Sequence, residues 1–177
     1  MSERSENDEE VVQGRRVVVE QRRLRRRDGR IEVREMVVHP GSVLIVPILA
    51  DGRIVLIRNR RFTIERTLLE LPAGTREGDE PFAICAAREL EEETGYRADS
   101  LRELLAFYPA PGTSDERMHV FVAHGLTATA QRLDQTEQIE VEPLPPREVL
   151  ARIREGVIED AKTIAAMLYY AAWGDSG

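Results

Sequence analysis

Three glutamates, Glu89, Glu92 and Glu93, stand at positions i, i+3 and i+4 of one acidic stretch. On a helix, this spacing brings their carboxylates onto a single face. Carboxylates held so close repel one another unless a cation lies among them, and hard oxygen ligands suit Mg²⁺ or Mn²⁺. The alternative is a solvent-facing acidic surface, which is the usual outcome for charge runs. The chemistry predicted first is therefore the binding of a divalent metal.

The flanking residues predict the helix that carries these glutamates. Pro81 suits a first helical turn, where its missing N–H costs nothing, and Asp79 or Glu80 can cap that end or favour its positive dipole. Gly95 suits the position after the helix, where a left-handed backbone is needed. The expected helix runs from about 81 to 94. A second face, expected to pack on a sheet, holds Ala83, Ala86, Ala87 and Leu90.

The spacing of residues around this helix is specific. It follows the pattern G-x5-E-x7-R-E-U-x-E-E-x-G-U, in which U is a bulky apolar residue. The fixed positions are Gly74, Glu80, Arg88, Glu89, Leu90, Glu92, Glu93, Gly95 and Tyr96. The segment 74–96 resembles the Nudix box, which requires agreement in both residue type and spacing. The chain is therefore similar to the Nudix hydrolases.

Three features outside the box resemble the ADP-ribose pyrophosphatase group of that family. Residues 70–74 read ELPAG, like the group's approach to the box. Pro111 lies fifteen residues beyond Tyr96, and residues 159–163, EDAKT, are similar to the start of the group's last helix. The resemblance implies an α+β fold, a Nudix-type α/β/α sandwich with a mixed sheet. The box would form a loop, a helix and a second loop.

The resemblance also implies a metal site. Glu89 and Glu93 would bind the metal directly, Glu92 would bind a second metal or its water, and the Ala73 carbonyl would complete the shell. Arg88 would pair with Glu80 and orient the carboxylates. The resemblance thus assigns catalytic roles to three residues of the box, which are Arg88, Glu92 and Glu93.

A further acid is expected from the loop before the last strand. Glu137 is the candidate base or extra metal ligand there; an ordinary solvated loop acid is the alternative. Gln135 stands where a related enzyme's base would be, and a glutamine cannot usefully accept a proton.

The resemblance assigns a second set of residues to the substrate. Arg61, with Arg58 nearby, would meet the phosphates, and Glu116 would contact the distal ribose. Glu70 and Pro111 belong to the same predicted substrate site.

Together these implications describe Mg²⁺-dependent hydrolysis, with Mn²⁺ as a possible replacement. The pyrophosphate bond of ADP-ribose or a similar nucleoside diphosphate sugar would give a nucleoside monophosphate and a sugar phosphate. No aromatic residue precedes Phe62, although the group often stacks adenine on one, and Ala110 replaces the usual serine before Pro111. GDP-mannose, NADH or a nucleoside triphosphate are therefore alternative substrates. A third hypothesis is a non-catalytic sensor that binds ADP-ribose.

Length and composition fit one globular domain, with 177 residues, 42% apolar and 32% charged. Residues 1–10 carry five acids and one arginine and are expected to form a disordered tail. A hairpin region is predicted for 11–40 and a Nudix hydrolase domain for 41–177. Because no apolar run approaches a membrane span and no signal peptide is evident, a cytoplasmic location without membrane contact is expected. The single cysteine, Cys85, suits packing better than chemistry.

Residues 15–34 carry nine arginines and three acids. An Arg27-Asp28-Gly29 turn between β-like segments 16–25 and 30–38 predicts an exposed hairpin first, contact with substrate phosphates second, and nucleic-acid binding a distant third. The resemblance implies a homodimer that exchanges such hairpins. The remaining patterns predict strands at 42–49, 53–57, 67–71, 101–107, 118–123 and 138–144, and helices at 147–154 and 160–173.

Overall fold

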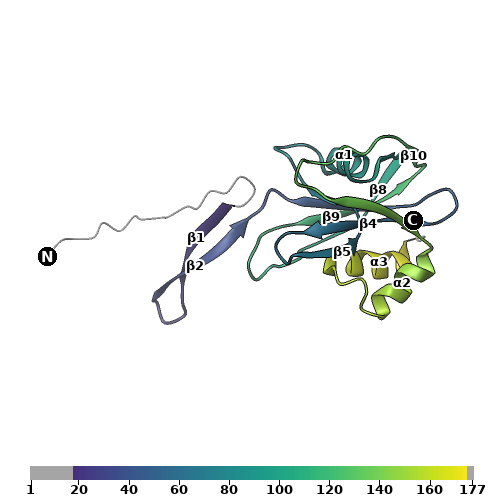
Figure 1. Ribbon diagram of the computed structural model, residues 1–177. Helices are drawn as coiled ribbons and strands as arrows, with labels where there is room; N and C mark the ends of the chain where they lie inside the picture. Colours follow the sequence, from purple (N-terminus) through teal and green to yellow (C-terminus); the bar gives the residue numbers. More distant parts are fainter. Residues whose placement is uncertain (1–17, 175–177) are drawn as a thin grey trace.

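The computed structural model describes residues 18–174 and places helices on both sides of a layer of strands (Figure 1). The strands are β1 (Val18–Arg25), β2 (Ile31–Val38), β3 (Ser42–Pro47), β4 (Ile54–Arg61), β5 (Arg66–Glu70), β6 (Ala73–Thr75), β7 (Tyr96–Arg97), β8 (Ser100–Phe107), β9 (Met118–His124), β10 (Thr127–Ala128) and β11 (Ile139–Leu144). The helices are α1 (Phe82–Thr94), α2 (Pro146–Arg154) and α3 (Ala161–Trp173). The predicted tail 1–10 and residues 11–17 of the predicted hairpin region lie outside the described residues.

The central strands form a mixed arrangement. One sheet has the order β6-β3-β9-β8, in which β3 and β9 are parallel and the other pairs antiparallel. A second, antiparallel sheet has the order β11-β4-β5. Alternation along β3 sends Val43 and Ile45 into the core beneath α1, and Leu44 and Val46 into the core beneath α2 and α3. The predicted α+β class and the α/β/α sandwich are confirmed.

The predicted N-terminal β-hairpin is also present. Strands β1 and β2 pair antiparallel from Val18 with Val38 to Arg25 with Ile31. Gly29, with a φ of 84°, supplies the left-handed residue of the turn. The hairpin projects away from the sandwich (Figure 1). Its base is tied to the loop between β8 and β9, because the Val37 N–H donates to the Thr113 carbonyl over 2.8 Å.

Helix α1 differs from expectation at its start and on one face. Pro81 is the N-cap, and no side chain caps the helix; Glu80 instead accepts hydrogen bonds from the Glu77 N–H and from Arg88. The predicted packing of Ala83 and Ala87 is wrong, since both are exposed. The buried positions are Cys85, Ala86, Leu90, Glu93 and Thr94. The predictions of Cys85 as a packing residue and of Gly95 as a left-handed cap, with a φ of 68°, are confirmed.

One strand prediction needs correction, and three short strands were missed. Strand β4 continues to Arg61 instead of ending at 57, because β5 and β11 supply hydrogen-bonding partners for these polar residues. Strands β6, β7 and β10 were not predicted, since two or three residues are too few to show a period. Within residues 18–174, no helix is long and apolar enough to cross a membrane.

Candidate active site

Helix α1 meets strand β6 at the centre of the candidate site. Glu93 is buried, with 4% of its surface exposed, and its Oε2 accepts a hydrogen bond of 2.8 Å from the Ala73 N–H. Burial raises the pKa of Glu93 well above its usual range; the Ala73 N–H opposes this shift, and the charges of Glu89 and Glu137 add to it. A buried acid beside two others favours a cation in its neighbourhood.

Glu89 lies directly against the backbone of Gly74. A Cβ added to Gly74 would stand 1.8 Å from the Glu89 Cδ, so the close approach needs a residue without a side chain. Burial raises the pKa of Glu89; Arg88 lowers it, while Glu92 and Glu137 raise it further. The glycine that opens the box pattern therefore makes room for one of its carboxylates.

Arg88 binds the carboxylates of the box together. Its Nη1 donates to Glu89 Oε1 over 2.8 Å and to Glu92 Oε2 over 3.1 Å, and its Nη2 donates to Glu80 Oε1 over 2.7 Å. Burial lowers the pKa of Arg88, but these carboxylates outweigh it and the pKa lies above its usual value. The structure thus contains the Arg88–Glu80 pair that the box resemblance implies.

The donor groups of this region fit a hard divalent cation. They are the carboxylates of Glu89, Glu92, Glu93 and Glu137. Burial raises the pKa of Glu89 and of Glu93, and the charge of Glu89 raises that of Glu93 further. Within residues 18–174, no three acidic, histidine or cysteine side chains stand together as a formed metal site. Arg88 holds Glu89 and Glu92, whereas Glu93 is held by backbone. All-oxygen donors of this kind suit Mg²⁺ or Mn²⁺.

The loop before β11 brings Glu137 to these carboxylates. Its Oε2 accepts from the Asp134 N–H over 2.9 Å, which closes a compact turn. Glu137 is half-buried, and its charge acts on both Glu89 and Glu93. Gln135 is exposed. Glu137 is therefore close enough for its charge to act on the box carboxylates, and its predicted role as base or metal ligand stays a prediction.

Half-buried Arg61 and fully buried Glu70 form an ion pair at the edge of the site. Arg61 Nε donates to Glu70 Oε1 over 2.9 Å and Nη2 donates to Oε2 over 2.5 Å, and Glu70 is 1% exposed. Such a two-point pair fixes the guanidinium plane. The Glu93 charge also acts on Arg61, and the pKa of Arg61 is raised, chiefly by its hydrogen bonds to Glu70.

Arg58 is separated from this pair. The register of β4 is continuous, so Arg58 points to the opposite side of the strand from Arg61. Its Nε contacts Glu142 Oε2 at 2.5 Å, and Glu142 also accepts from Arg152 of α2. The structure therefore does not bring Arg58 together with the other predicted substrate residues.

Glu116 is positioned by the sheet. Its Oε1 accepts from the Ser42 hydroxyl over 2.6 Å. Ser42 pairs with Thr75 across β3 and β6, and the Thr75 carbonyl accepts from Arg88 over 3.3 Å. These contacts place the loop that carries Glu116 beside the box loop.

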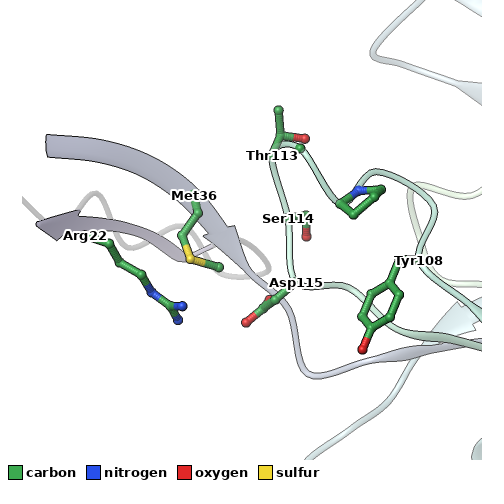
Figure 2. Close-up of a pocket in the computed structure, with 8 residues that line it drawn as sticks. Arg22, Met36, Tyr108, Thr113, Ser114 and Asp115 are labelled. Atoms are coloured by element: carbon green, nitrogen blue, oxygen red, sulfur yellow. The ribbon is translucent and has the colours of Figure 1, made fainter. Parts of the chain in front are cut away.

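A pocket of about 340 Å³ lies between the hairpin and the loop between β8 and β9 (Figure 2). Pro111 is one of its lining residues; its predicted contact with substrate stays a prediction. Arg22, from the arginine-rich hairpin, also lines it. Sequence reasoning missed the other side chains there, which are Met36, Tyr108, Thr113, Ser114 and Asp115. The available signal was Tyr108, an aromatic residue in a loop rich in proline and glycine. The ring of Tyr108 is half exposed, and the Arg117 guanidinium lies 5.4 Å from its centroid.

The fold and this set of carboxylates define a Nudix-type hydrolase. The model of the NUDIX domain family matches residues 38–167. The chain belongs to the Nudix family and is a Nudix hydrolase that resembles the ADP-ribose pyrophosphatases.

Known proteins support this membership. An ADP-ribose pyrophosphatase of Bacillus subtilis is 39% identical, over 80% of this chain and 78% of its own. A methanol dehydrogenase activator of Bacillus methanolicus is 36% identical, over 94% and 91%. A GDP-mannose pyrophosphatase of Cronobacter sakazakii is 32% identical, over 80% of each chain. The crystal structure of an ADP compounds hydrolase has the same fold, with a TM-score of 0.81, 24% identity and 98% of each chain covered.

Proposed function

We propose that the chain uses Mg²⁺ to hydrolyse the pyrophosphate bond of ADP-ribose or a similar nucleoside diphosphate sugar. The products are a nucleoside monophosphate and a sugar phosphate. One observation carries the proposal: Glu89 lies against the Gly74 backbone, Glu93 is bound to the Ala73 N–H, and the charge of Glu89 adds to the burial that raises the pKa of Glu93. Such a pair is suited to a divalent cation that also binds phosphate oxygens.

The metal would be held by Glu89, Glu93 and the Ala73 carbonyl, with Glu92 binding a second metal or its water. Bound Mg²⁺ lowers the pKa of water and neutralises charge on phosphoryl oxygens. Arg88 orients the carboxylates, because its two terminal nitrogens bind Glu80, Glu89 and Glu92 at once.

Glu137 accepts a proton from the attacking water. The water oxygen adds to one phosphorus, the bridging P–O bond at that phosphorus breaks, and the bridging oxygen leaves on the other phosphate. Arg61, fixed by Glu70, presents its guanidinium to the phosphates. Arg58 has no part in this proposal, since it faces the other side of β4.

The sugar and the base extend from the box toward the pocket of Figure 2. Glu116 and Pro111 contact the distal ribose. Tyr108 offers an aromatic face in this pocket, so base stacking does not need an aromatic residue earlier in the chain. The similarity to a GDP-mannose pyrophosphatase makes another nucleotide sugar the alternative substrate.

The first test is product analysis with purified protein, Mg²⁺ and four substrates: ADP-ribose, GDP-mannose, NADH and dGTP. Release of AMP and ribose 5-phosphate from ADP-ribose, with the highest kcat/KM of the panel, is expected. Cleavage of another member with ADP-ribose untouched would keep the reaction and replace the substrate. Inactivity toward all four would refute the proposed function.

Activation of a methanol dehydrogenase is a second candidate function, favoured by the relative of that name, which matches 94% of this chain. The rate of methanol oxidation by such a dehydrogenase, measured with and without this chain, tests it. A rate increase that a Glu93→Gln variant also gives would mean activation by binding. An increase lost in that variant would mean activation through hydrolysis.

The chain is also proposed to be a homodimer in which the N-terminal hairpins contact the partner. The projecting hairpin of Figure 1 supports this, because Ile31 and Val33 are exposed over about half their surface.

A further inference from the structure

A buried polar chain connects the start of α3 to the segment that precedes the box. Thr163 is fully buried. Its hydroxyl donates to Asp160 Oδ2 over 2.7 Å and accepts from the Leu71 N–H over 2.9 Å. A hydroxyl has one proton to donate, so an acceptor that takes this proton fixes the direction of the oxygen lone pairs.

Asp160 is that acceptor. Burial raises the pKa of Asp160, but the Lys162 ammonium and the two Thr163 donors outweigh burial and hold the pKa below its usual value. An ionised carboxylate accepts hydrogen bonds and donates none. The Thr163 proton must therefore point to Asp160, and a lone pair is left for the Leu71 N–H.

Four consecutive residues of the segment 70–73 are each bound to a different element of the fold. The bonds run from Glu70 to Arg61 of β4, from Leu71 to Thr163 of α3, from Pro72 to Ile45 of β3 and from Ala73 to Glu93 of α1. Pro72 lies between Leu71 and Ala73, and its ring fixes its own φ torsion, which makes this part of the backbone stiff. A displacement of Leu71 is therefore transmitted to Ala73 and to the carboxylate that Ala73 holds.

We propose that Thr163 is a positioning residue of the active site: through Leu71 and Ala73 it fixes the carboxylate of Glu93. The inference rests on the proposed function and adds to it a residue of α3, 92 positions along the chain from Leu71. Asp160 acts with Thr163 by orienting its hydroxyl.

The competing explanation is that Thr163 only docks α3 on the sheet. A second contact, between β5 and the residues just before α3, provides a matched control. Arg66 of β5 binds Glu159, the residue before Asp160, with an Nη2–Oε2 distance of 2.5 Å. This pair is exposed and contacts neither Leu71 nor Ala73. Arg66→Gln removes one docking contact of α3 and leaves the Thr163 chain in place.

The experiment compares Thr163→Val, Thr163→Ser and Arg66→Gln with the wild-type chain. Valine keeps the branched shape and removes the hydroxyl, whereas serine keeps the hydroxyl. A misplaced catalytic group lowers turnover strongly, so Thr163→Val should lower kcat at least about tenfold. Its KM should stay within about twofold of wild type, because the phosphate and sugar contacts remain. Thr163→Ser and Arg66→Gln should keep wild-type kcat.

Amide hydrogen exchange of Ala73, followed residue by residue by NMR without substrate, gives a readout that does not depend on activity. Thr163→Val should speed this exchange at least about tenfold, whereas Thr163→Ser should not. Unchanged kcat or unchanged Ala73 exchange in folded Thr163→Val would overturn the inference, as would an equal loss of kcat in Arg66→Gln.

Two further results are also decisive. If the wild-type chain cleaves no member of the nucleotide panel, the proposed function fails, and Ala73 exchange still decides whether Thr163 fixes the Glu93 contact. If Thr163→Val does not fold, native-state exchange of the wild-type chain decides. If the amides of Leu71, Ala73 and Thr163 exchange through one common opening reaction, Thr163 and Ala73 are coupled. If the Ala73 amide exchanges through an opening of its own, the inference is overturned.

Discussion

At the scale of single residues, Glu93 carries the sharpest prediction. Glu93→Gln keeps a side-chain oxygen that can accept from the Ala73 N–H and removes a buried charge that repels Glu89 and Glu137. The fold should therefore be at least as stable without added metal. Turnover should fall by about 100-fold or more, since even outer-shell changes at metal sites cost 10- to 100-fold.

The matched control for this change is Glu91→Gln in the same helix. Glu91 faces Arg132, with an Nη2–Oε1 distance of 3.5 Å, and has no contact with the box carboxylates among its described interactions. It should leave kcat/KM within about twofold of wild type. Thermal unfolding and kcat/KM of both variants are to be measured together. Wild-type turnover by folded Glu93→Gln would remove Glu93 from the mechanism.

Cys85 is predicted to be unreactive in the folded chain. Its side chain is fully buried, and burial, followed by the Glu80 and Glu89 charges, raises the pKa of its thiol from 9.0 to about 12. The fraction of thiolate at pH 8 is then about 1,000-fold lower than in the unfolded chain. A thiolate-selective colorimetric reagent should label the denatured chain rapidly and the native chain only as it opens. Rapid native labelling would contradict this environment.

The same shift gives a dependence of stability on pH. An unfolded thiol ionises near pH 9.0 and the folded one near 12, so above pH 9 the unfolded chain releases a proton that the folded chain keeps. The contribution of Cys85 to stability is present below pH 9 and is lost as the pH rises toward 12. Denaturant unfolding from pH 8 to 10 should show a steeper loss for wild type than for Cys85→Ala, by about 1.4 kcal/mol at pH 10.

At the scale of elements, β6 and α1 meet at Gly74, and the space left by its missing side chain sets where the Glu89 carboxylate lies. A Cβ at Gly74 would lie 1.8 Å from the Glu89 Cδ and 2.1 Å from its Oε1. Only the end of a flexible side chain must move, so Gly74→Ala should cost at most about 1 kcal/mol of unfolding free energy. The displaced Glu89 should lower kcat by about tenfold or more. Steady-state kinetics and denaturant unfolding check both parts; unchanged kcat would remove Glu89 from the site.

At Gly95, at the other end of α1, a substitution should lower stability more than turnover. Its φ of 68° is left-handed, and an added Cβ would meet the Gln131 backbone nitrogen at 3.0 Å. Backbone cannot yield as a side chain can, so Gly95→Ala should cost about 1 kcal/mol or more of stability. The folded fraction should keep most of its turnover, because the carboxylates lie earlier on the helix. Loss of turnover without loss of stability would contradict this reading.

The elements show which parts of the structure the sequence could predict. The box spacing correctly predicted α1 and the shared region of Glu89, Glu92 and Glu93, because helix period and capping are local properties. Local patterns did not separate Arg58 from Arg61. The predicted strand ended at residue 57, so the alternation that places these two arginines on opposite sides of β4 could not be applied to them. Nor could they predict Tyr108 opposite the hairpin, or Thr163 on Leu71, which are contacts between distant segments.

At the scale of the whole molecule, the hairpin predicts the oligomeric state. Ile31 and Val33 are 53% and 51% exposed, and the register places both on one face, opposite Arg25 and Arg23. Two exposed apolar side chains on a projecting hairpin, with Arg25 and Arg23 beside them on the same face, are stabilised when a second chain covers them. Light scattering after size exclusion should give twice the chain mass. Val33→Glu should shift that mass toward the monomer, and its new carboxylate faces Arg23, so the hairpin itself should persist.

Leu168→Glu separates this interface from other apolar surfaces. Leu168 lies on α3, is 51% exposed, and belongs to an element on the sandwich, away from the hairpin (Figure 1). If the hairpin forms the interface, Leu168→Glu should keep the dimer mass while Val33→Glu loses it. A monomeric wild-type chain at micromolar concentration would refute the dimer. If Leu168→Glu breaks the dimer and Val33→Glu does not, the interface lies on α3. The hairpin would then only line the substrate pocket.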